Sequence, residues 1–215
     1  MSGDEVRSGG SHETVAPSDG ARGLEARSGL SLTLVLSVED PRWEAAFGDP
    51  DEVVAATLDH AAKGIDVDRP VTSEISVTLT DDASVREINR EWRNQDKPTN
   101  VLSFPMLDLE PGDSPGPLVG DLVLAYETCE VEAARDGKPF LNHARHLLVH
   151  GLLHCLGHDH MDDEEAEAME ALEIVILSGL DIPDPYAIAD ERPSRDNRTE
   201  GEDEPHRAGS DRRRI

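Results

Sequence analysis

Alternation of apolar and polar side chains predicts two strands in the first half of the chain. Leucine or valine occupies every even position from 32 to 38, and isoleucine, valine or leucine occupies every odd position from 75 to 79. A period of two residues places these side chains on one face of a strand. Two shorter apolar runs, at 101–104 before Pro105 and at 122–125, predict two further strands.

Helical spacing of apolar residues predicts a helix after each of the first two strands. The segment 50–63 follows Asp49 and ends at Gly64, which are typical helix boundaries. A second helix begins after an aspartate pair, and we expect one stripe of its side chains to be buried: Val85, Ile88 and Trp92.

Two more helices are predicted near the end of the folded region. The first begins near Pro139 and carries a run of histidines, and its expected buried residues are Leu148, Leu152 and Leu156. The second opens with four acids at 162–165, which favour a helix N-terminus, and ends at Gly179. Its expected buried residues are Met169, Leu172 and Ile176. The Pro- and Gly-rich segment 107–119 predicts a mobile loop over the functional site.

The two ends of the chain differ from its middle in composition. Residues 1–28 are rich in Ser, Gly, Glu and Arg, and residues 188–215 are strongly charged. We expect two disordered tails around one domain at 29–187. Such tails explain why the mean hydropathy of the 215-residue chain is only −0.50.

The cysteines and the absence of long apolar runs predict a soluble cytoplasmic protein. The only two cysteines, Cys129 and Cys155, lie in segments that read as regular structure, so buried free thiols are the simplest expectation. We find no apolar stretch of membrane-spanning length and expect no membrane partner.

The formal net charge of −26 argues by itself against a nucleic-acid partner, since phosphate binding depends on Lys and Arg. Two alternatives weaken that argument. Part of the acid lies in the tails and in the first turn of the last helix. A salt-adapted source would also make its proteins acidic, and strong screening would then weaken their global field.

The most specific chemical signal is the histidine run at 150–160. His150 and His154 are four residues apart and share one face of a helix. Gly157 suits a helix end, after which the chain can reverse and bring His160 to the other two. Three neutral imidazoles predict a site for one zinc ion with an open fourth position, which is the catalytic pattern. The same spacing occurs in zinc peptidases, but Gly151 stands where their glutamate base stands.

Three further residues in or beside this run have two possible interpretations each. His146 lies one turn before His150 and either supports the site or is a polar residue at the cavity edge. His158 either competes as a ligand or points elsewhere. Asp159 either orients an imidazole or is a plain turn residue.

A basic stripe on the second helix offers a partner for an anion. Arg86, Arg90 and Arg93 are spaced four and three apart and cluster away from the expected apolar stripe. The alternative is a solvated face with weak local ion pairs. A zinc site in the same chain favours an anion-binding function.

Three motifs together carry a resemblance. They are the run from Glu91 to Pro105 (E-W-R-N-Q-D-K-P-T-N-V-L-S-F-P), the Gly120-Asp121 pair, and the run from His150 to His160. Residues 30–186 resemble the YbeY family of bacterial rRNA-maturation endoribonucleases. The resemblance implies a small α+β domain with a mixed four-stranded sheet and the histidine helix at a cleft. It also implies a metal-dependent enzyme that cuts single-stranded RNA in 16S rRNA 3′-end maturation and in ribosome quality control.

The resemblance assigns roles to four positions. His150, His154 and His160 would be the metal ligands, and Arg93 the functional arginine. Three positions depart from the family pattern. Trp92 replaces a common tyrosine, Asn100 replaces the usual aspartate, and His158 replaces the usual tyrosine.

Within that expectation, zinc would activate water and polarise the phosphate, while Arg93 would stabilise the developing charge. Asp159 or His146 would assist if a base is needed, and the nucleophile is either water or the ribose 2′-OH. The rival functions are a zinc-stabilised assembly factor that binds the small ribosomal subunit without cutting, a zinc peptidase, and a metal-dependent hydrolase of a small molecule.

Overall fold

A computed structural model describes residues 29–159 and 162–187 of the chain. The chain divides into a compact unit, residues 1–185, and a C-terminal unit, residues 186–215. The helices and strands of the described residues all belong to the first unit. Both predicted tails, 1–28 and 188–215, lie outside the described residues, so their disorder stays a prediction.

Four strands form one mixed sheet in the order β1-β2-β4-β3. The strands are β1 (Leu30–Val38), β2 (Val71–Thr80), β3 (Val101–Pro105) and β4 (Leu118–Ala125). Strands β1, β2 and β4 run parallel to one another. The edge strand β3 runs antiparallel to β4, with Ser103 opposite Leu122. The predicted α+β fold with a mixed four-stranded sheet is confirmed.

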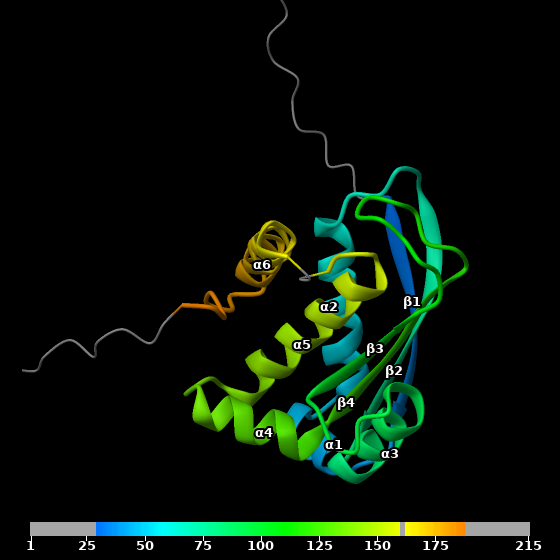
Figure 1. Ribbon diagram of the computed structural model, residues 1–215. Coiled ribbons are helices and arrows are strands. Elements are labelled where there is room, and N and C mark those ends of the chain that lie inside the picture. The colour runs from blue at the N-terminus through cyan, green and yellow to red at the C-terminus, as the bar shows by residue number, and fades with distance from the viewer. Residues whose placement is uncertain (1–28, 160–161, 188–215) are drawn as a thin grey trace, which may run out of the picture. The chain divides into compact units, whose positions relative to one another are not determined.

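One face of the sheet carries the main core. Helices α2 (Pro50–Gly64) and α5 (Phe140–Cys155) pack on this face, and α6 (Asp163–Ser178) packs against both of them. Figure 1 shows α2 and α5 beside the sheet, with α6 beyond α5. The predicted buried leucines of α5 are at most 2% exposed, which confirms that prediction: Leu148, Leu152 and Leu156. In α6, Met169 and Ile176 are buried as predicted, and Leu172 is partly buried against the same core.

The other face is covered by α3 (Asp82–Arg93), which packs against β3 and β4 through a small cluster around Val85 and Leu102. The Asp81 carboxylate caps this helix by accepting a hydrogen bond from the Ser84 amide at 2.8 Å. The predicted burial of Trp92 is wrong, because its side chain is 70% exposed. Trp92 lies in the last turn, beside an edge strand. Helical period gives the direction of a side chain but not whether enough structure lies opposite it.

Two helices were not predicted from the sequence: α1 (Arg42–Phe47) and α4 (Tyr126–Arg135). Both support a buried aromatic cluster centred on Trp43, whose ring contacts Phe47, Tyr126 and Phe140. A six-residue helix is too short to show a clear period. The fourth strand begins at Leu118, four residues before its predicted start at 122, so the preceding loop is 106–117.

Among the described residues, no helix is long and apolar enough to cross a membrane. Both cysteines are free and buried, as predicted.

Candidate metal and phosphate site

Helix α5 presents four histidines along one side. The two in its N-terminal half each meet a carboxylate: His143 Nε2 lies 3.0 Å from Glu132, and His146 Nε2 lies 2.8 Å from Glu173. Burial lowers the pKa of His143 below its usual value, although Glu132 acts in the opposite direction. This half of the helix is therefore a closed polar contact within the core.

The two histidines of the C-terminal half face each other. The Nε2 atoms of His150 and His154 are 3.1 Å apart. The Nδ1 atom of His154 lies 2.9 Å from the His158 carbonyl oxygen, which can only accept, so this nitrogen is the one that carries a proton. The Nδ1 atom of His150 lies 2.8 Å from Glu173, and an ionised carboxylate likewise requires a donor.

This arrangement fixes the chemistry of the two rings. When both are neutral and protonated at Nδ1, each Nε2 atom carries a lone pair, and the two lone pairs point toward one another. Two lone pairs at 3.1 Å repel one another, whereas a shared proton or a metal ion at their meeting point attracts both. A carboxylate or carbonyl behind each ring is also the usual arrangement around metal-binding histidines. The pair therefore fits a metal ion on its Nε2 side.

Glu173 was missed by the sequence analysis. Its side chain is fully buried, and its two oxygens accept from His146 and His150. It lies among the buried residues of α6, four positions after Met169. An acid on this otherwise apolar face was the sequence feature that could have identified it as a functional residue. These three residues also form a second candidate cation site, because their ligand atoms lie within 4.8 Å of one another.

The end of α5 turns as the glycine predicts. Gly157 has φ 86°, and the His158 amide donates to the Leu153 carbonyl at 3.0 Å. A side chain at 157 would meet the Leu109 carbonyl oxygen at 2.1 Å, so the loop before β4 lies directly against this turn. His160, the third predicted ligand, lies outside the described residues.

Arg93 reaches the site from the other side of the sheet. Its Nη2 atom donates to the Ser103 carbonyl on the edge strand at 2.8 Å, and its Cζ atom lies 5.5 Å from the centre of the Phe104 ring. The other two arginines of the predicted stripe are paired elsewhere. Arg86 binds Asp96 at 2.7 Å, and Arg90 lies 3.6 Å from Glu87.

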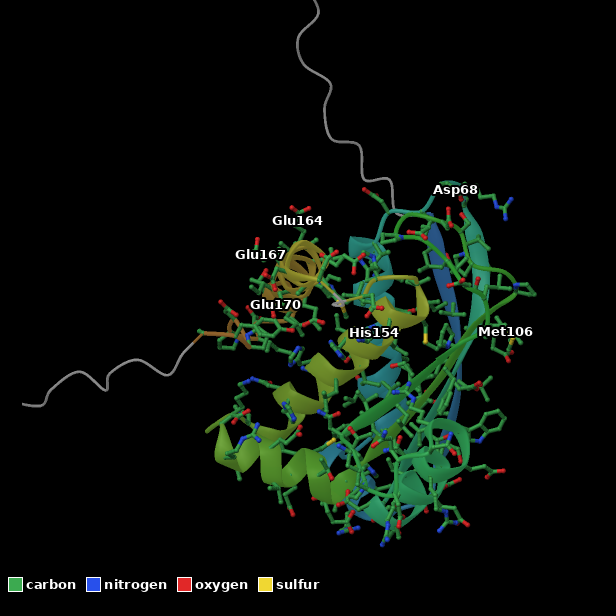
Figure 2. All side chains as sticks on the ribbon, viewed as in Figure 1. Asp68, Met106, His154, Glu164, Glu167 and Glu170 are labelled. Carbon is green, nitrogen blue, oxygen red and sulfur yellow. The ribbon has the colours of Figure 1, made fainter. Side chains whose placement is uncertain are left out.

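These groups meet in one open cavity of about 480 Å³. The histidine pair and Arg93 line it together with three residues of the turn after α5, which are Gly157, His158 and Asp159. The other lining residues belong to β3 or flank it: Asn100, Val101, Ser103, Pro105, Leu107, Asp108 and Leu109. The loop thus contributes to the site, as predicted, while its mobility stays a prediction. Burial lowers the pKa of His158 below its usual value, so this ring is neutral near pH 7. Figure 2 shows His154 at the centre of the view, with Glu164, Glu167 and Glu170 projecting from α6.

Gly151 has a packing reason that the sequence did not show. A Cβ atom there would lie 2.8 Å from a methyl group of Leu122 and 3.2 Å from the Ser103 hydroxyl. Position 151 therefore faces the sheet at close approach, and the glutamate of a zinc peptidase has no room in this arrangement. Burial raises the pKa of the neighbouring Cys155 thiol to about 12, so this thiol is protonated near pH 7 in the metal-free protein.

Asn100 joins the cavity to the closed half of α5. Its amide nitrogen donates to Glu132 at 2.9 Å, and Glu132 also lies 3.0 Å from His143. Its side-chain oxygen accepts from the Val101 amide at 2.7 Å. No sequence pattern indicates this link, because its three members come from different elements.

The fold and the site together define a class: a small α+β protein with a candidate cation site at paired imidazoles and an arginine in one cleft, as suits a hydrolase of anionic substrates. The family model described as Endoribonuclease YbeY matches residues 42–181. The chain is 61% identical over 163 residues to "Endoribonuclease YbeY" of Sinorhizobium fredii, covering 73% of this chain and 92% of that protein. It is 50% identical over 165 residues to the protein of the same name from Allorhizobium ampelinum, covering 73% and 95%.

A solution structure of a Thermotoga maritima protein aligns with 75% of this chain and 100% of that chain, at 21% identity and a TM-score of 0.40, a likeness on which nothing below depends. The family match and the sequence identities are sufficient by themselves to establish the family of this chain. This chain belongs to the YbeY endoribonuclease family.

Proposed function

We propose that this protein is a metal-dependent endoribonuclease that cuts single-stranded RNA and matures the 3′ end of 16S rRNA. The observation that carries the proposal is the pair of Nε2 atoms 3.1 Å apart, opening into a cavity that Arg93 also lines. Family membership supports RNA as the substrate and strand cleavage as the reaction.

One zinc ion would be held by His150, His154 and His160. The first two fit this role because Glu173 and the His158 carbonyl hold their Nδ1 atoms and direct both Nε2 atoms to one point. When bound, zinc would supply Lewis-acid chemistry at a phosphoryl oxygen and at a water molecule. The second candidate site is the less suitable one, because both oxygens of Glu173 already accept from imidazoles.

Arg93 would bind the scissile phosphate. Its planar group keeps further N–H donors while Nη2 is held by the Ser103 carbonyl, so the side chain is fixed in position and can still pair with an anion. Charge developing on the phosphate during cleavage strengthens those hydrogen bonds, which lowers the barrier.

Two carboxylates, Asp108 and Asp159, line the same cavity, and one of them would accept the proton that the nucleophile loses. His146 is held by Glu173 and does not line the cavity, so Asp159 is the better of the two assistants predicted from sequence. Attack by the ribose 2′-OH leaves a 2′,3′-cyclic phosphate, whereas attack by water leaves none, and the product ends therefore identify the nucleophile.

The proposed partners are the 16S rRNA precursor and the small ribosomal subunit, in the cytoplasm. The charge of −26 is consistent with such a partner because, among the described residues, Asp108 and Asp159 are the acids that line the cavity. The six acids at 162–170 are all exposed, and none of them lines the cavity.

The test compares metal content and cleavage of a single-stranded RNA for the wild type and three variants. The wild type should hold about one zinc and cut. His154→Ala should lose both properties. Arg93→Ala should keep the metal and cut roughly 100- to 1000-fold more slowly, as for loss of one donor to a transition state. Arg90→Ala, an exposed arginine of the same helix, is the matched control and should behave as the wild type.

Zinc binding without cleavage, in protein free of contaminating nuclease, would overturn the enzymatic proposal. An assembly factor that binds the small subunit without cutting would then be the better account. Equal losses for Arg90→Ala and Arg93→Ala would contradict the specific role of Arg93.

A further inference from the structure

One aromatic side chain of this protein stands apart from the others. The rings of Trp43, Phe47, Tyr126 and Phe140 contact one another at 5.1–6.2 Å around a fully buried tryptophan. Trp92, in contrast, is 70% exposed and meets the Phe104 ring edge-on, with the ring centres 6.3 Å apart. An exposed indole offers a large flat apolar surface to a ligand.

The surroundings of Trp92 connect it to the cavity. The Phe104 ring contacts the Trp92 ring and also lies 5.5 Å from the Arg93 guanidinium carbon. Arg93 is held by the Ser103 carbonyl and lines the cavity. The three side chains therefore form one contact group at the edge strand β3, and Arg93 connects it to the proposed phosphate position.

The apolar surface continues past the end of β3. Met106 and Leu107 are 50% and 48% exposed, and Leu107 lines the cavity. In Figure 2, Met106 projects from the side of the molecule opposite α6. Three of the large apolar side chains that are exposed among the described residues thus lie beside β3 or directly after it: Trp92, Met106 and Leu107.

Charge favours the same route for an anionic strand. The exposed acids of α6 repel phosphate on their side of the cleft. On α3, Arg86 and Arg90 are balanced by Asp96 and Glu87, so this side repels phosphate less. A polynucleotide whose phosphate lies at Arg93 is steered along the β3 edge.

We propose that Trp92, supported by Phe104, is a stacking site for a nucleobase next to the phosphate that Arg93 binds. The proposal rests on the RNA-binding function given above. A flat aromatic surface beside a cation suits a single strand, because its unpaired bases can stack without regard to sequence. Trp92 is then a positioning residue: it fixes the register of the strand and leaves the metal site unchanged.

The protein carries its own reporter for this contact. It has two tryptophans, and Trp43 is fully buried, so contact quenching by a bound base reports on Trp92. The probe is an eight-nucleotide 2′-O-methyl single-stranded RNA, whose integrity after the titration is checked on a gel. Quenching and fluorescence anisotropy of an end label give contact and affinity from one titration.

Three variants separate stacking from structure. Trp92→Ala should weaken binding about tenfold, the loss expected for one stacked base, and abolish the quenching. Trp92→Tyr keeps a ring and should bind nearly as the wild type. Val131→Ala, which removes a side chain of similar exposure on α4, should change nothing. All variants should retain the metal content of the wild type.

A series of probes with one abasic position completes the test. The penalty of Trp92→Ala should vanish for the one probe that lacks the stacked base. Normal binding by Trp92→Ala, or equal losses for the alanine and tyrosine variants, would overturn the stacking site and leave RNA binding intact. If the wild type does not bind the probe, RNA binding itself fails, and the stacking site fails with it.

Discussion

The two halves of α5 carry histidines at similar helical spacing and use them differently. In the N-terminal half, His143 and His146 face carboxylates and are nearly buried. In the C-terminal half, His150 and His154 face each other at the open cavity. The spacing places all four on one side of the helix, but the group behind each ring decides which nitrogen is left for a ligand. Support from Glu173 and the His158 carbonyl at Nδ1, rather than spacing alone, therefore distinguishes the candidate metal site of His150 and His154.

Replacing one histidine of each half should give the largest difference in zinc affinity between the two halves. His154→Ala removes one of the two facing nitrogens. Loss of an orienting partner lowers metal affinity by at most roughly 100-fold, and loss of this ligand should lower zinc affinity by more than that. His143→Ala should leave zinc affinity unchanged, because its ring is turned to Glu132. Titration against a chelating indicator measures both, and similar losses in the two variants would contradict the division of the helix.

Glu173 contacts one histidine of each half, and its replacement tests whether it orients His150 or binds the metal itself. Glu173→Gln removes the charge that holds His150 Nδ1–H, and zinc affinity should fall roughly 10- to 100-fold. Glu170→Gln, on the exposed side of the same helix, is the matched control. A loss larger than that of His154→Ala would instead make Glu173 a ligand, as in the second candidate site.

Gly151 lies between the two histidines of the C-terminal half and faces the sheet. Gly151→Ala forces Leu122 or Ser103 to move, and such overpacking should lower the free energy of unfolding by about 1–3 kcal/mol. Gly116→Ala makes an ordinary contact with Leu107 at 3.4 Å and should cost much less. Urea unfolding of both metal-free variants measures the difference, and equal stability would show that the close approach is not limiting.

The smallest effect concerns acid. Burial lowers the pKa of His143, so the unfolded chain takes up a proton at this residue before the folded protein does as the pH falls below about 6.5. The unfolded state then binds more protons, and stability contributed by neutral His143 is lost on going from pH 7.5 toward pH 5. His143→Gln should make the stability of metal-free protein less dependent on pH in this window. An unchanged slope would show that His143 does not titrate there.

Periodicity predicted most of the fold, and it failed where local pattern carries no information. The alternation at 32–38 and 75–79 and the leucines of α5 depend only on which face is buried. The six-residue helix at Arg42 has no measurable period, and the exposure of Trp92 depends on where the sheet ends. The extra four residues of β4 include Gly120 and Asp121, which interrupt an apolar run.

The site was predictable where it is local in sequence. His150, His154 and Gly157 lie within two turns, and the structure brings the two rings together. Arg93 reaches the same cavity from another element, and the family resemblance, rather than spacing, singled it out from Arg86 and Arg90. Glu173, Ser103 and Glu132 are distant in sequence from the residues they hold, so no spacing could have paired them.

Nitrogen-15 NMR of the imidazole rings during a zinc titration tests the central claim most directly. One equivalent of zinc should shift the Nε2 resonances of His150 and His154, while their Nδ1 atoms stay protonated and the His143 and His146 resonances stay in place. A shift of His146 Nε2 together with His150 Nδ1 would place the metal at Glu173 instead and contradict the account.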